Sequence, residues 1–151
     1  MKKLLIGLFI FLGLGNLFGS DSSTVEEIEL SRDRLRFLIS ETLGEVENLE
    51  NYFNSGDMQS VEIGYQDVSN HIKDKIEGLE RLNDKSSPSE RDFYCLNNII
   101  LFHNSLLEYI RPMYEYAKGD IEYYEYENRF QVAENNFKVA FENLHSRGFF
   151  N

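Results

Sequence analysis

The side chains most suited to metal chemistry are the three histidines, His71, His103 and His145. His145 follows Glu142 by three positions, a spacing that di-iron helical bundles use for metal ligation. Those sites carry the motif on two helices, whereas here it occurs once. His145 also falls in the expected last turn of a helix, where a histidine is favoured by the negative end of the helix dipole. His103 lies on an apolar stripe and is interpreted as a core histidine. We therefore predict no metal site and no cofactor.

Nucleophilic catalysis has little support in the sequence. The chain has no G-x-S-x-G motif and no glycine loop of the kind that cradles phosphate. Its one cysteine, Cys95, lies among apolar neighbours and is predicted to be a buried thiol. We therefore expect a protein that is not an enzyme, although an enzyme with an unfamiliar site stays as a third hypothesis.

Tyrosines form the most unusual cluster of the sequence. Six of them fall within 18 residues and do not share one helical face: Tyr109, Tyr114, Tyr116, Tyr123, Tyr124 and Tyr126. Tyrosine is enriched at interfaces because it joins a large flat ring to a polar tip. The six residues are our candidate interaction patch for a protein or a glycan. The alternative is a tyrosine-rich bundle end, whose rings cover the core while their hydroxyls reach water.

The N-terminal residues predict export. Lys2 and Lys3 precede an uncharged apolar run over residues 4–18, and this order indicates a secretory signal peptide spanning residues 1–19. The run is shorter than the roughly 20 apolar residues of a membrane span. Leu17 weakens the cleavage site, so a retained anchor stays as the alternative. The Met-Lys-Lys-Leu-Leu start is typical of bacteria, and we expect a periplasmic, cell-surface or secreted protein.

The charge balance limits the possible partners. The chain has 15 Lys+Arg against 26 Asp+Glu, a net charge of −11. Loss of the signal peptide removes Lys2 and Lys3 but no acid, which leaves residues 20–151 at −13. Such a chain is repelled by nucleic acid and by anionic lipid headgroups. We predict no nucleic-acid binding and no membrane insertion after cleavage.

Residues 20–151 read as a single helical domain. Apolar residues recur at helical spacing, and glycine, proline and capping residues divide the chain into four helices of similar length, at about 24–53, 57–82, 88–118 and 121–146. Ser87-Pro88-Ser89-Glu90 is a capping box that should start the third helix, and Asp120 can cap the fourth. Short connections between equal helices predict an antiparallel up-down four-helix bundle. The two residues Gly119-Asp120 form a very short connection for reversing the chain direction between the third and fourth helices. If these helices instead continue as one long rod, the alternative is an elongated coiled-coil hairpin.

Our leading functional hypothesis is a non-enzymatic protein-interaction or structural component of the bacterial cell envelope, with an unknown protein partner. The second is a helical bundle that carries a small ligand or metal, suggested by His103 and by Glu142 with His145. Heptad stripes serve contacts within one chain and between chains equally well. The sequence therefore leaves a homo-oligomer open.

Overall fold

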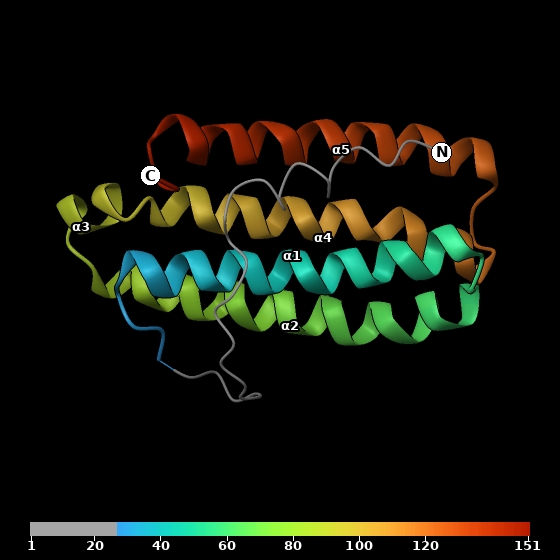
Figure 1. The fold of residues 1–151 in the computed structure, drawn as a ribbon, viewed down its shortest axis with the longest axis horizontal. Helices are drawn as coiled ribbons and strands as arrows, with labels where there is room; N and C mark the ends of the chain where they lie inside the picture. Colours follow the sequence, from blue (N-terminus) through green and yellow to red (C-terminus); the bar gives the residue numbers. More distant parts are fainter. Residues whose placement is uncertain (1–26) are drawn as a thin grey trace.

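The computed structural model describes residues 27–151, which form an all-α bundle. Its helices are α1 (Arg32–Ser55), α2 (Met58–Lys85), α3 (Pro88–Phe93), α4 (Leu96–Lys118) and α5 (Tyr123–Ser146). The four long helices pack antiparallel (Figure 1). This arrangement confirms the predicted four-helix bundle, and the elongated hairpin was the wrong alternative. The predicted signal peptide, residues 1–19, and the predicted start of the first helix at residue 24 lie outside the described residues.

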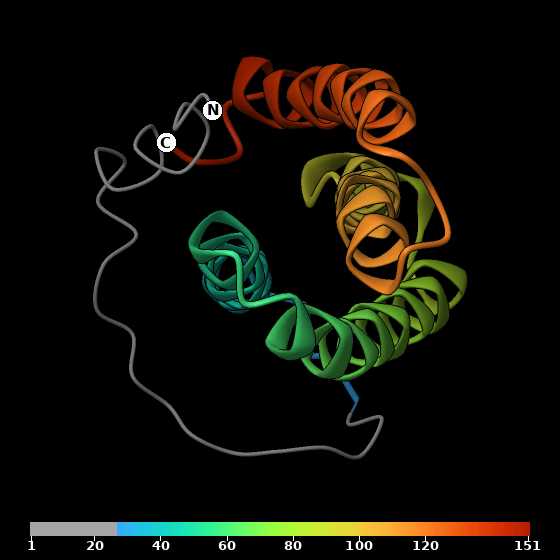
Figure 2. The ribbon, with the colours of Figure 1, turned by 90° about the vertical axis from the view of Figure 1, so that its right-hand side faces the viewer.

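The long helices follow one another around the bundle in chain order. α1 packs against α2, α2 against α4, and α4 against α5, while α4 also touches α1. Seen along the helix axes, they form an open arc with α1 and α5 at its two ends (Figure 2). We call the side between α1 and α5 the seam.

The first helix begins later than the sequence predicted. Ser31 caps it, because its Oγ accepts a hydrogen bond from the Arg34 backbone N–H at 3.2 Å. Residues 27–30 are not helical, and Ile28 in that segment packs against the core. At the other end Gly56 takes a left-handed conformation with φ of 79°, and its N–H donates to the Phe53 carbonyl, which ends the helix.

The predicted third helix is two helices. The capping box forms as expected: Ser87 Oγ accepts from the Glu90 N–H, and the Glu90 carboxylate accepts from the Ser87 N–H. The helix nevertheless stops at Phe93, because Cys95 adopts a left-handed φ of 54° before α4 starts. Such a φ is uncommon outside glycine, so no residue type announced this break. The predicted burial of Cys95 is confirmed.

The turn between α4 and α5 reverses the chain in four residues. Gly119 has φ of 80°, and the Asp120 N–H donates to the Glu115 carbonyl at 2.9 Å. The prediction that Asp120 caps the last helix was wrong, because α5 begins only at Tyr123. The Asp120 carboxylate instead lies 3.2 Å from the Lys118 Nζ.

Glycine lets α2 approach α1 closely. A Cβ on Gly64 would lie 3.3 Å from Cδ1 of the buried Leu49 on α1, tighter than ordinary van der Waals contact. The core between the helices is apolar and aromatic, with Phe102, Ile72, Leu35 and Phe149 among its fully buried side chains.

Candidate functional site

Tyrosines gather at one end of the bundle, where α1 and α4 finish and α2 and α5 begin (Figure 1). Phe53 in the last turn of α1 joins the elements there: its ring centroid lies 4.9 Å from that of Tyr126 and 5.9 Å from that of Tyr116. We call this region the tyrosine-rich end, made of Tyr52, Tyr116, Tyr123, Tyr124 and Tyr126. It unites residues from α1, α4 and α5 across two turns of the chain.

Two of the six candidate tyrosines are core residues. Tyr126 is 7% exposed and Tyr109 is 4% exposed, and both rings pack against Phe130, at centroid distances of 5.4 Å and 4.8 Å. Tyr109 lies deeper, where its ring also contacts Phe137. These two side chains stabilise the bundle and offer little surface to a partner.

Tyr109 has a buried polar partner. Its phenol donates a hydrogen bond to the carboxylate of Glu50 on α1, so the two side chains link α1 to α4. Burial raises the pKa of Tyr109, and the nearby Glu50 charge raises it further. Burial also raises the pKa of Glu50, while the hydrogen bond from Tyr109 lowers it. The pair is a structural link between α1 and α4.

Tyr114 and Tyr116 are half-buried and already engaged. The Tyr114 ring stacks on Tyr65 of α2 with centroids 4.1 Å apart and an interplanar angle of 9°, and its hydroxyl accepts from the Gln66 side chain at 3.3 Å. Tyr116 packs edge-on against Phe53. Tyr114 thus faces α2 and stands apart from the tyrosine-rich end.

Exposed rings at this end come from α1 and α5. Tyr124 is 76% exposed, Tyr123 is 44% exposed, and Tyr52 matches Tyr123 at 44%. The Tyr123 ring contacts the half-buried Tyr116 and the buried Tyr126, so these two rings support the exposed one. Sequence reasoning missed Tyr52, because it lies far from the cluster along the chain. Its position just before the Asn54-Ser55-Gly56 helix stop was the only signal that it would reach this end.

Carboxylates surround the exposed rings. Glu122, Glu125 and Glu127 are all exposed in or beside the first turns of α5. Glu127 accepts a hydrogen bond from the Tyr123 phenol, which raises the pKa of Tyr123. The cation Arg129 is engaged by two of the local carboxylates, because its guanidinium lies 2.6 Å from Glu115 and 3.5 Å from Glu125. The surface around the tyrosines is therefore acidic.

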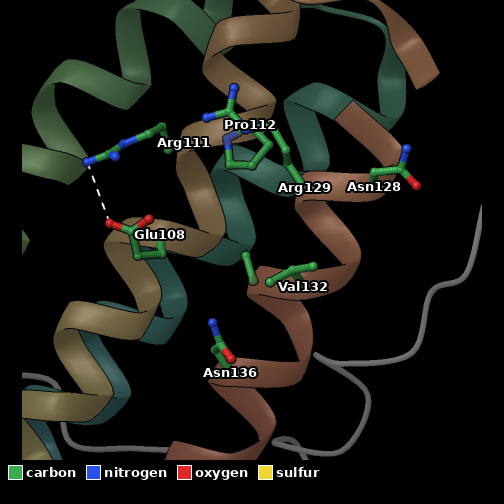
Figure 3. A pocket seen from close by; sticks show the side chains of 8 residues that line it. Glu108, Arg111, Pro112, Asn128, Arg129, Val132 and Asn136 are labelled. Atoms are coloured by element: carbon green, nitrogen blue, oxygen red, sulfur yellow. Dashed lines mark ion pairs between the residues drawn. The ribbon is translucent and has the colours of Figure 1, made fainter. Parts of the chain in front are cut away.

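A shallow groove of about 350 Å³ runs between α4 and α5 beside this end (Figure 3). Pro112 and Ala133 contribute apolar surface, and Val132 stands 62% exposed at its side. Arg129 lines the groove too, although its charge is already engaged by Glu115. The groove extends the exposed surface along α4 and α5.

The structure confirms the interpretation of His103 and shows where Glu142 and His145 lie. His103 is fully buried, as predicted: its Nδ1 lies 2.8 Å from the Ile99 carbonyl and its Nε2 lies 3.2 Å from the Thr42 hydroxyl. Glu142 and His145 are both exposed near the end of α5. Within residues 27–151, no three His, Cys, Asp or Glu side chains lie close enough to hold a metal ion.

None of the helices in the described part of the chain is both long and apolar enough to cross a membrane. Comparisons with protein-family models, with curated proteins and with solved structures found no match. A functional assignment for this chain therefore rests on its own residues and geometry.

Proposed function

We propose that this chain is a non-enzymatic interaction protein of the bacterial cell envelope, exported by residues 1–19, which binds a protein partner through the tyrosine-rich end. One observation carries the proposal: the exposed rings of Tyr52 on α1 and of Tyr123 and Tyr124 on α5 lie at the same end of the bundle, although α1 and α5 are far apart in the sequence. The rings of Tyr116 and Tyr126 support that of Tyr123.

The rings suit recognition for a physical reason. A tyrosine side chain has few rotatable bonds, so it offers a large contact area at a small cost in conformational entropy. The ring of Tyr123 is already held by Tyr116 and Tyr126, which lowers that cost further. Tyr124 is the most exposed and is the ring best placed to enter a pocket on a partner.

Charge indicates the chemistry of the partner. Residues 20–151 carry a net charge of −13, and Glu122, Glu125 and Glu127 lie among the exposed rings. A partner surface with lysine or arginine would meet these carboxylates, and its cations could also lie over tyrosine faces. We therefore expect a basic protein segment as the partner.

Photo-crosslinking in the source bacterium tests this proposal. A photoreactive residue replaces Tyr124 in one strain and Phe93 in a control strain. Phe93 is 58% exposed and lies in α3, at the far end of the bundle. We expect one discrete crosslinked protein from position 124 in the envelope fraction and none from position 93. Equal crosslinking from both positions, or protein found only in the cytoplasm, would contradict the proposal.

A further inference from the structure

The outer side of α4 carries a long stretch without charge. The twelve residues from Leu96 to Leu107 contain no Asp, Glu, Lys or Arg. Within this stretch the apolar side chain of Leu101 is 60% exposed. Leu101 precedes Glu108 by seven residues, about two helical turns, so it lies on the side of α4 that borders the groove between α4 and α5 (Figure 3).

The neighbouring helix α5 continues this uncharged surface across the groove. Val132 and Val139 are 62% and 56% exposed, and Asn136 lies between them on the same side of the helix. Val132 and Asn136 line the groove, which places this side of α5 next to α4 and away from the seam. We call the surface the neutral face, made of six exposed residues: Leu101 and Asn104 on α4, and Val132, Asn136, Val139 and Asn143 on α5.

Charges at the border of the neutral face are paired with one another. The Arg111 guanidinium lies 3.6 Å from the Glu108 carboxylate, as the dashed line in Figure 3 marks. On α5 the Lys138 Nζ lies 3.4 Å from the Glu134 carboxylate. The face therefore presents apolar and amide groups, although the whole chain has a net charge of −11.

The neutral face is suited to a second copy of the same chain. Two acidic copies repel each other where their charged surfaces meet, and on this face they can approach without bringing like charges together. An asparagine amide both donates and accepts hydrogen bonds, so an asparagine surface can pair with an identical one. A twofold axis brings the same surface of each copy together and requires this self-complementarity.

We propose that the neutral face is the interface of a homodimer with twofold symmetry, in which Leu101, Val132 and Val139 pack between the two copies. From Val132 to Asn143 the face is about 17 Å long, at 1.5 Å per residue. Interfaces of such limited extent belong to weak, reversible complexes. The dimer should therefore form in the micromolar range of protein concentration.

This interface is independent of the proposed function. The neutral face lies along the sides of α4 and α5, whereas the exposed rings of Tyr123 and Tyr124 lie where α5 begins. Salt also separates the two interactions. Dimerisation should become stronger as salt screens the repulsion between acidic copies, whereas binding of a basic segment should become weaker.

Sedimentation equilibrium of the purified protein over a dilution series tests the proposal. Leu101→Glu and Val139→Glu each place a charge in the neutral face, and Ile63→Glu is the matched control, because Ile63 on α2 is 63% exposed and the change in net charge is the same. All three positions are exposed, so the fold should survive. We expect the first two variants to raise the dimer dissociation constant at least about tenfold, the scale of an interface hot spot, and the control to change it by less than about twofold.

A second measurement uses the unaltered protein. The methyl NMR signals of Val132 and Val139 should shift on dilution, while those of Ile63 should stay in place. A protein that remains monomeric up to about 1 mM, far above the micromolar range of weak complexes, would overturn the proposal. Equal dissociation constants for the three glutamate variants, or dilution shifts at Ile63 without shifts at the two valines, would also overturn it.

Discussion

The Nε2 atom of His103 on α4 lies 3.2 Å from the hydroxyl oxygen of Thr42 on α1, with both side chains fully buried. Nδ1 faces the Ile99 carbonyl, which can only accept, so the neutral ring carries its proton there. The Thr42 hydroxyl donates its own proton to the Leu38 carbonyl at 2.8 Å, and its oxygen faces Nε2. The Thr42 oxygen in turn accepts from the Lys75 Nζ at 3.1 Å. Burial, helped by the Lys75 charge, lowers the pKa of His103 to about 4.

The lowered pKa of His103 predicts that the folded protein loses stability in mild acid. The unfolded chain takes up a proton at its ordinary pKa of 6.5, whereas the folded chain resists it until about pH 4. The unfolded state therefore binds more protons in that window, and the free energy of unfolding falls as the pH falls through it. A shift of this size corresponds to about 3 kcal/mol, lost between pH 6.5 and 4.

Chemical denaturation at pH 7 and pH 4.5 measures this effect. His103→Gln should be less stable at pH 7 and show a smaller fall in unfolding free energy between the two pH values. His145→Gln, which removes an exposed histidine, is the matched control and should keep the full pH dependence. A His103→Gln profile parallel to that of the unaltered protein would refute the assignment.

Removing the phenol of Tyr109 should reduce stability without affecting partner binding. Tyr109→Phe leaves the half-buried Glu50 carboxylate without its donor, at a cost of about 1–3 kcal/mol. In a double-mutant cycle with Glu50→Gln, the second change should cost less once the first is present. Strictly additive losses in thermal or urea unfolding would show that the hydrogen bond contributes nothing.

Two glycines should respond differently to alanine. Gly44 lies inside α1, and an added Cβ there meets nothing within 4 Å, so Gly44→Ala should stabilise the protein by about 1 kcal/mol. Gly64→Ala gains the same helix propensity, but its added Cβ would press on the buried Leu49. This variant should therefore be stabilised by less than Gly44→Ala, or should be less stable than the unaltered protein. Urea unfolding of both variants decides the matter, and equal stabilisation would mean that α1 and α2 are not closely packed at Leu49.

The stability cost of replacing a candidate tyrosine should depend on how deeply its ring is buried. Tyr126→Ser removes a buried ring and should cost about 3–5 kcal/mol, as large aromatic truncations do. Tyr124→Ser removes an exposed ring and should change the unfolding free energy by no more than about 0.5 kcal/mol. Similar losses for the two variants in thermal unfolding would contradict the division.

Helical periodicity and capping residues were enough to predict the bundle. Ser87 with Glu90 and the stops at Gly56 and Gly119 mark their boundaries by side-chain chemistry that acts within a few residues. The break at Cys95 was not predictable, because cysteine is not a residue type that prefers the left-handed backbone found there.

The candidate surface was only partly predictable from the sequence. The clustering of tyrosines was visible in the sequence, but their division into buried Tyr126 and exposed Tyr124 depends on which face of α5 meets the core. Tyr52 is far from the other tyrosines in the sequence, and only the folded chain brings it to the same end of the bundle.

The most direct test of the central claim measures binding of a basic partner to the tyrosine-rich end. The full chain is titrated with a lysine- and arginine-rich peptide of about ten residues at low and high salt, since screening weakens exposed charge contacts. Tyr123→Ser with Tyr124→Ser should weaken binding by about tenfold or more, the scale of aromatic hot spots, while Phe93→Ser should not. If all three proteins bind the peptide equally well, the tyrosine-rich end is not the recognition surface.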